Sequence, residues 1–126
     1  MEVRALAVER REPLVRRQPA RVPVPEVACF LQDVLGQRLA AEAVGVRDPK
    51  AVGAWARGAR LPHPQTAIHL RHAYEVVQLL LEQEGAETVR AWFAGMNPEL
   101  DDRSPASQMA AQPAAVVGAA RAFLAG

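Results

Sequence analysis

The 126-residue sequence predicts an all-α protein. Ala and Leu dominate its apolar residues, Ile occurs only at Ile68, and the β-branched residues are mainly scattered Val, a composition typical of helices rather than strands. After residue 25, apolar residues recur at helical spacing through most of the chain. A chain of this length has room for one domain with a hydrophobic core and a tail.

The first 24 residues are predicted to form a flexible basic arm. Pro13, Pro19 and Pro23 are spaced so closely that no helix or strand of useful length fits between them. Residues 1–21 hold six Arg and three Glu, a net charge of +3. Two interpretations stay open, an arm that contacts phosphate groups and an extension without a partner.

Two short helices are predicted to follow the arm. The first starts at Pro25, which suits the first turn of a helix, and its apolar residues recur at i, i+3, i+4, i+7 and i+8 before Gly36. The second covers Gln37–Val44 and ends at Gly45, which can adopt the positive φ of a helix exit. Both belong to a helix-turn-helix region that we expect over residues 25–62.

A third short helix is predicted from Asp48 as N-cap and Pro49 at the first helical position through to Gly58. Its apolar side should bury Val52, Trp55 and Ala56. The side that is left facing outward would carry Lys50, Gly53, Ala54 and Arg57.

Four further helices are predicted in a C-terminal domain over residues 65–126. Helical apolar periodicity and the N-cap pair Ser104-Pro105 indicate them. The last one has apolar residues on nearly all sides and Arg121 as its only charge, so we expect another surface to cover it. The expected bounds are Gln65–Glu84, Glu87–Ala94, Pro105–Met109 and Pro113–Leu124.

Composition also excludes several classes of protein. The single Cys29 cannot form an internal disulfide or a four-cysteine zinc site, which favours a reducing, cytoplasmic setting. No apolar run of about 18 residues indicates a membrane span, and none indicates a signal peptide. We expect no enzyme and no cofactor, because no nucleophile with a base, glycine-rich phosphate loop or paired carboxylates is found. The three His lack a completing ligand for a metal site.

Residues 39–62, LAAEAVGVRDPKAVGAWARGARLP, place a helix, a glycine-containing turn and a second capped helix within about twenty residues, the spacing of a helix-turn-helix. Trp55, Gly58 and Pro62 fall in a W-x-x-G-x-x-x-P order that is similar to the Xre/Cro type. The interval from Gly45 to Trp55 is one residue longer than in that type. The turn must therefore absorb an extra residue.

A surplus of positive charge accompanies this motif, because residues 37–60 carry a net charge of +3. If the third helix enters the major groove, Lys50 and Arg57 can donate to guanine, while Arg38, Arg47 and Arg60 contact phosphates. Because this helix offers so few base-reading side chains, useful affinity for DNA would require two copies in a dimer. Alternatively, the three helices are the packing unit of a protein-binding module. The candidate DNA-binding residues are Arg38, Arg47, Lys50, Ala54, Arg57 and Arg60.

A second set of motifs lies beyond residue 64. It comprises the start of a long helix at Arg71 to Tyr74, Trp92 in a short helix, Asn97-Pro98 and Leu100 in a loop, Ser104-Pro105, and a closing Ala122-Phe123-Leu124. In this order they resemble the C-terminal domain of the MbcA/ParS/Xre antitoxins. With the helix-turn-helix, the resemblance covers residues 26–126. The acidic loop Asp101-Asp102-Arg103 and the basic arm depart from the family pattern.

The resemblance implies the antitoxin of a type II toxin-antitoxin system whose partner is a RES-domain toxin that consumes NAD⁺. Such antitoxins cover the toxin's active site with their C-terminal region, commonly dimerise and bind their own promoter. Arg121 would suit a carboxylate of that active site. Asn97-Pro98 and Ser104-Pro105 also have a purely structural interpretation, as a turn and a helix start. The candidate toxin-binding residues are Trp92, Asn97, Pro98, Leu100, Pro105, Val117, Arg121, Phe123 and Leu124.

The main alternative function is a stand-alone helix-turn-helix transcriptional regulator. Charge is compatible with either function, since residues 61–126 carry four Arg and seven acidic residues, a net of −3. The two functions differ in the partner that they require. An antitoxin gene lies beside a RES-domain gene, and its product protects cells from that toxin.

Overall fold

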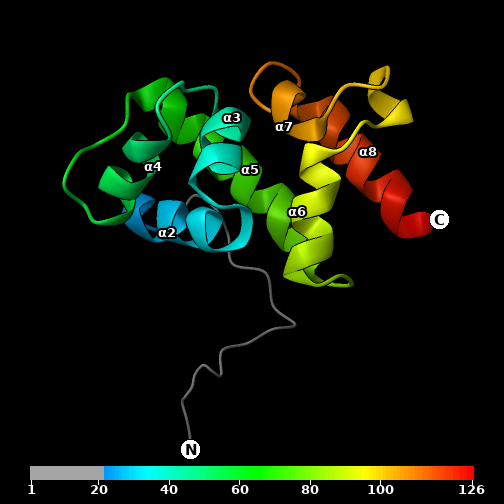
Figure 1. The fold of residues 1–126 in the computed structure, drawn as a ribbon, viewed down its shortest axis with the longest axis horizontal. Coiled ribbons are helices and arrows are strands. Elements are labelled where there is room, and N and C mark those ends of the chain that lie inside the picture. The colour runs from blue at the N-terminus through cyan, green and yellow to red at the C-terminus, as the bar shows by residue number, and fades with distance from the viewer. Residues whose placement is uncertain (1–21) are drawn as a thin grey trace, which may run out of the picture.

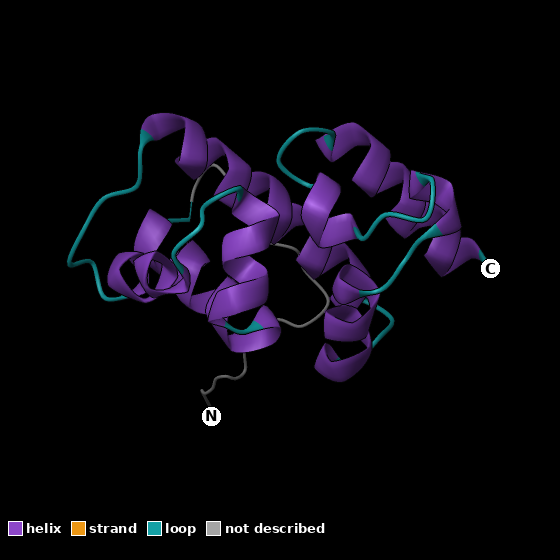
Figure 2. Cartoon of the chain, turned by 45° about the horizontal axis from the view of Figure 1, so that its top comes forward, coloured by secondary structure: helices purple, strands orange, loops and turns teal. Residues whose placement is uncertain are grey.

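The computed structural model describes residues 22–126, so the predicted arm over residues 1–24 lies almost entirely outside the described residues. Within residues 22–126 the chain forms seven α-helices, one 3-10 helix and no strand, which confirms the all-α prediction (Figure 2). The elements are α2 (Val24–Leu35), α3 (Gln37–Val44), α4 (Pro49–Ala56), α5 (Pro64–Leu81), α6 (Ala86–Ala94), η2 (Pro98–Leu100), α7 (Pro105–Gln108) and α8 (Pro113–Ala125).

Four elements, α4, α5, η2 and α7, begin after a residue whose side chain accepts from one of their first backbone N–H groups. The carboxylate of Asp48 accepts from Lys50 N at 3.0 Å at the start of α4, and Ser104 Oγ accepts from Ser107 N at 3.2 Å at the start of α7. Proline occupies one of the first two positions of α2, α4, α5, η2, α7 and α8, where its missing N–H costs nothing. Three helices end earlier than predicted: α4 ends at Ala56 rather than Gly58, α5 at Leu81 rather than Glu84, and α7 at Gln108 rather than Met109.

Helix α5 forms the axis of the molecule (Figure 1). Helices α2, α3 and α4 gather at one end of it, and α6, α7 and α8 gather at the other. The two groups also touch directly, because α2 packs on α6 and α3 packs on α7. Helices α2, α3 and α4 are therefore held in one arrangement with helices α6, α7 and α8.

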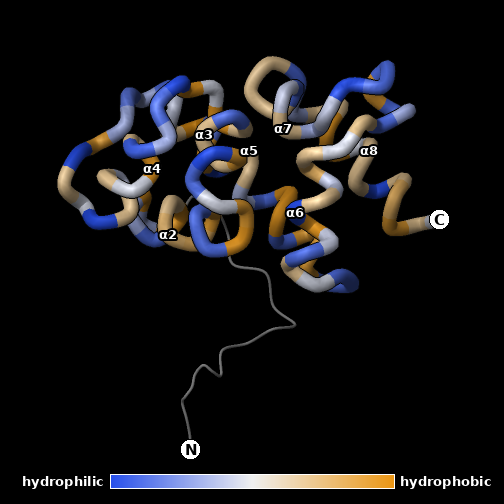
Figure 3. Tube along the Cα trace, in the orientation of Figure 1, coloured by the Kyte–Doolittle hydropathy of each residue, from blue (hydrophilic) through white to orange (hydrophobic). Residues whose placement is uncertain are grey.

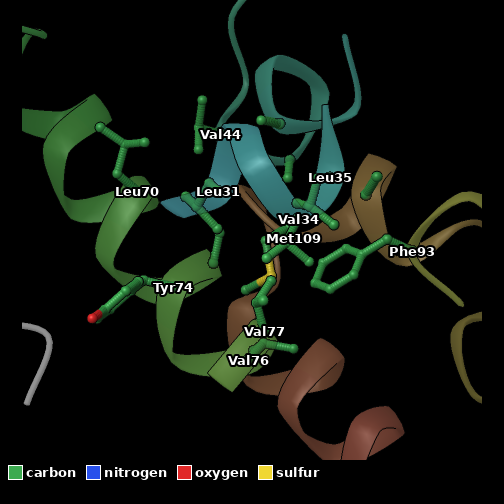
Figure 4. Packing of buried hydrophobic residues seen from close by; sticks show 14 of the residues in the cluster. Leu31, Val34, Leu35, Val44, Leu70, Tyr74, Val76, Val77, Phe93 and Met109 are labelled. Carbon is green, nitrogen blue, oxygen red and sulfur yellow. The ribbon is translucent and has the colours of Figure 1, made fainter. Parts of the chain in front are cut away.

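One hydrophobic core runs through both groups. Along the helices, hydrophobic and hydrophilic residues follow one another (Figure 3). Five residues with no more than 1% of their surface exposed meet in this core (Figure 4). They are Leu31, Val44, Leu70 and Phe93, from four different helices, and Met109, which directly follows α7. Burial of such side chains contributes about 1.5 to 3 kcal/mol each.

Two long-range hydrogen bonds satisfy the carbonyl ends of the N-terminal helices. Arg90 Nε of α6 donates to Val34 O of α2 at 3.0 Å, and His69 Nδ1 of α5 lies 3.2 Å from Val44 O of α3. The last carbonyls of a helix lack intrahelical partners and carry its negative dipole end, so donors placed there are stabilising. These bonds fix how α2 and α3 sit on the rest of the molecule.

Candidate functional site

The turn between α3 and α4 is built on Gly45, which has a φ of 82°. Gly45 N donates to Glu42 O at 3.1 Å and Val46 N donates to Ala41 O at 3.0 Å, the bond pair of a Schellman helix end. Residues 45–48 then lead to the Asp48 cap of α4. Helix α4 starts at Pro49, as predicted.

Helix α4 presents a narrow outer face. Val52 and Trp55 are buried as predicted, Lys50 and Arg57 are exposed, and Ala54 is half-buried. Gly53, predicted to face outward, is buried, so that prediction is wrong. The physical reason is a polar cover from neighbouring helices: Gln37 donates to Gln32 Oε1 at 2.8 Å, and its Nε2 lies 2.5 Å from the position that a Cβ on Gly53 would take.

Lys50, Ala54 and Arg57 are spaced at i, i+4 and i+7 and therefore share one side of α4. We call these three residues the reading face. Arg38 in the first turn of α3, Arg47 in the turn and Arg60 after α4 are exposed around it. None of the five cations forms an ion pair with another residue of the described range 22–126. The structure thus collects all six candidate DNA-binding residues on α3, α4 and the segments next to them.

Two aromatic side chains meet at the other end of the molecule. Trp92 of α6 stands edge-on to the buried Phe93, with ring centroids 5.2 Å apart and planes at 83°. On its other side lies Phe123 of α8, with ring centroids 6.3 Å apart, and Phe123 keeps 41% of its surface exposed. Of the two adjacent rings of α6, Phe93 packs in the core and Trp92 is half-buried.

Helix α8 buries one side and leaves the rest available. Val116, Ala119 and Ala120 are buried against the core, whereas Val117 and Leu124 are partly exposed and Arg121 is exposed. Met96, directly after α6 and its closing Gly95, keeps 81% of its surface exposed. We call the following residues the partner surface: Trp92, Met96, Pro98, Val117, Arg121, Phe123 and Leu124.

Three of the candidate toxin-binding residues have buried side chains, namely Asn97, Leu100 and Pro105. Asn97 Oδ1 accepts from Glu99 N at 2.9 Å, and the backbone of Asn97 bonds Arg103 and Asp102. These contacts close the loop that carries Asp101 and Asp102, which have φ values of 57° and 64°. In this structure the three residues hold the loop in place, and their side chains do not reach the surface.

Sequence reasoning missed three of the exposed apolar side chains. Met96 and Leu61 each keep 81% of their surface exposed, and Ile68 keeps 46%. Met96 follows a helix-ending glycine, and Leu61 lies in a loop bounded by Pro62. Both are large apolar residues at positions that periodicity assigns to no helix, and this could have drawn attention to them.

Within residues 22–126, no group of three or more His, Cys, Asp or Glu side chains is arranged to hold a metal ion. In the same range no helix combines the length and the apolar character needed to cross a membrane. Comparison with family models, curated proteins and solved structures gives no match.

Proposed function

We propose that the chain is the antitoxin of a type II toxin-antitoxin pair and that its partner surface docks on a RES-domain toxin that consumes NAD⁺. The observation that carries this proposal is the ring pair Trp92 and Phe123, because residues far apart in sequence meet to form an aromatic edge outside the core. Exposed aromatic groups backed by a rigid core are typical anchors of protein interfaces.

Neutralisation needs no chemistry from this chain. Helix α8 ends the described chain and carries an exposed Arg121 between partly exposed apolar residues. An amphipathic helix of this kind fits a groove, with its apolar residues as anchors. The Arg121 guanidinium can form a bidentate pair with a carboxylate of the toxin's NAD⁺ site. The docked helix then excludes the substrate sterically.

We also infer that the antitoxin binds operator DNA through the reading face. Arg38, Arg47 and Arg60 are exposed on α3 and on the segments before and after α4, and none has an ion-pair partner within residues 22–126. Phosphate contacts by Arg and Lys supply affinity without sequence information. Lys50 and Arg57 can donate to guanine, and the Ala54 methyl can contact a thymine methyl. A stand-alone regulator would have the same reading face but no need for the partner surface.

Co-expression with the RES-domain toxin of the neighbouring gene tests the antitoxin proposal. Growth and cellular NAD⁺ are measured, and binding is measured with the purified pair. The wild-type chain should restore both readouts. Phe123→Asp and Arg121→Glu should each weaken toxin binding by about tenfold or more, because each removes an anchor from the interface.

Leu61→Asp is the matched control, because Leu61 is a large exposed apolar residue. It lies in the connection between α4 and α5, at the end of the molecule away from α6 and α8 (Figure 1). This variant should neutralise the toxin as well as the wild type. If Arg121→Glu neutralises at equal stoichiometry, Arg121 is not the polar anchor. If the neighbouring gene encodes no such toxin and the purified chain binds DNA without a protein partner, the regulator function replaces the antitoxin function.

A further inference from the structure

The outer side of α4 has a gap in its row of side chains at Gly53. Lys50, Gly53 and Arg57 follow one another at spacings of three and four residues, so they lie along the same side of the helix as the reading face. Gly53 brings no side chain to this row, yet it is buried. Groups from outside α4 therefore cover the helix at this position.

The cover at Gly53 consists of two glutamine amides from the corner between α2 and α3. Gln32 lies in the last turn of α2, and Gln37 is the first residue of α3. Gln37 Nε2 lies 2.5 Å and Gln32 Oε1 lies 3.4 Å from the position that a Cβ on Gly53 would take. Arg57 Nη1 of the reading face also lies 3.4 Å from that position. Two amides and a guanidinium thus meet at one point on α4.

Gln37 keeps free the two groups with which an amide reads a base. Its Nε2 donates one hydrogen to Gln32 Oε1 at 2.8 Å, and this bond holds the amide in place. Its Oε1 and its second amide hydrogen have no partner within residues 22–126. Gln37 is exposed, whereas Gln32 is half-buried. A free carbonyl oxygen beside a free N–H is the arrangement with which Gln binds adenine, accepting from N6 and donating to N7.

The place of Gln37 favours a base over a phosphate as its partner. Its amide lies against the middle of α4, between Lys50 and Arg57, which are the two residues proposed to donate to guanine. Arg38, its neighbour in the sequence, is exposed and carries the charge that suits a phosphate. A neutral amide held beside the reading face instead adds a donor and acceptor pair that distinguishes adenine from the other bases.

From these contacts we propose that Gln37 reads an adenine in the major groove and that Gln32 positions it. The adenine lies next to the guanine that Arg57 contacts, because Gln37 Nε2 and Arg57 Nη1 approach the same point on α4. Gly53 is the residue that makes room for the amide. The proposal rests on the DNA binding inferred above, and it adds a base specificity that α4 alone does not carry.

The test uses the full chain and duplexes that it selects from a random pool. Gel shift gives the affinity for the best duplex and for duplexes changed one base pair at a time. The wild type should prefer adenine about tenfold or more at a base pair next to the one whose preference Arg57→Ala relaxes. Gln37→Ala should remove this adenine preference and leave the other preferences within about twofold. Gln32→Ala should weaken the same preference by about threefold, because Gln37 loses the bond that holds it.

Gly53→Ala tests the placement of the amide without removing a polar group. The added Cβ would lie 2.5 Å from Gln37 Nε2, so this flexible side chain must move away. The variant should lose the adenine preference as Gln37→Ala does. Its midpoint of unfolding in urea should be no lower than that of the wild type, because Ala suits a helix interior better than Gly. Loss of the preference in a stable variant separates the placement of Gln37 from the integrity of the fold.

Gln112→Ala is the matched control, because Gln112 Nε2 donates to Gln108 Oε1 at 3.4 Å in a second amide pair, next to α8. It should keep every base preference. A wild type without the adenine preference, or a preference that survives in Gln37→Ala, overturns this proposal alone. Uniform weakening of all duplexes by Gln37→Ala also overturns it, since Gln37 would then be a phosphate contact. Failure of the wild type to bind any selected duplex overturns the DNA-binding function as well.

Discussion

At Gly45, the turn after α3 lies close to Ala110 in the segment after α7. The Gly45 φ of 82° is one that residues with a side chain rarely adopt, and a Cβ on this glycine would lie 3.2 Å from Ala110 Cβ. We expect Gly45→Ala to lower the free energy of unfolding by about 1 to 2 kcal/mol, through backbone strain and this close approach. Urea unfolding followed by circular dichroism measures it.

Gly118→Ala is the control for that substitution. Gly118 lies inside α8, and a Cβ on it would meet nothing within 4 Å. Ala is favoured over Gly in a helix interior by about 1 kcal/mol, so this variant should gain stability. A Gly45→Ala variant as stable as wild type would mean that the α3 turn and Ala110 do not constrain each other.

Some features of single residues can be predicted from their neighbours in the sequence, and others depend on residues of another element. Asp48 and Ser104 predicted their helix starts correctly because an N-cap acts on backbone groups two or three residues away. Gly53 was predicted wrongly because its burial depends on Gln37 of another helix, which α4 periodicity cannot show. The burial of Asn97 and Leu100 could not be predicted for the same reason, because their loop is closed by the hydrogen bond from Asn97 N to Arg103 O.

At the scale of elements, the bounds of the helices were predictable to within a few residues, but their contacts were not. Composition predicted that another surface covers α8, and the structure shows which of its residues are buried within the chain: Val116, Ala119 and Ala120. Arg90 and Val34 are 56 positions apart, so no local sequence pattern predicts the hydrogen bond between α6 and the end of α2. Such bonds orient the elements that carry the candidate sites.

Removal of that bond has a measurable cost. We expect Arg90→Ala to lower the free energy of unfolding by about 1 kcal/mol, because Val34 O loses a charged donor at a helix C-terminus. Chemical denaturation measures the change. Arg38→Ala is the matched control, since Arg38 is also an exposed helical arginine, and its loss should change stability by less than about 0.5 kcal/mol. Equal effects of the two changes would show that the bond to Val34 adds nothing.

At the scale of the whole molecule, the sequence suggested separate regions over residues 25–62 and 65–126, whereas the core contains residues of both. The chain happens to carry one tryptophan in each region. Trp55 is buried in the N-terminal group, and Trp92 is half-buried in the C-terminal group. Each indole therefore reports on the packing of its own end of the molecule.

Because one core spans both ends, we expect them to unfold together. Two single-tryptophan variants, Trp92→Phe and Trp55→Phe, report the N-terminal and the C-terminal group by fluorescence. In each variant the fluorescence transition in urea should coincide with that of its own helical circular dichroism signal. The comparison within one variant removes the effect of the substitution on stability. A fluorescence transition of Trp92 that precedes loss of the helical signal would instead show that α6, α7 and α8 unfold as a separate unit. In that case the core would not couple partner binding at α8 to the reading face.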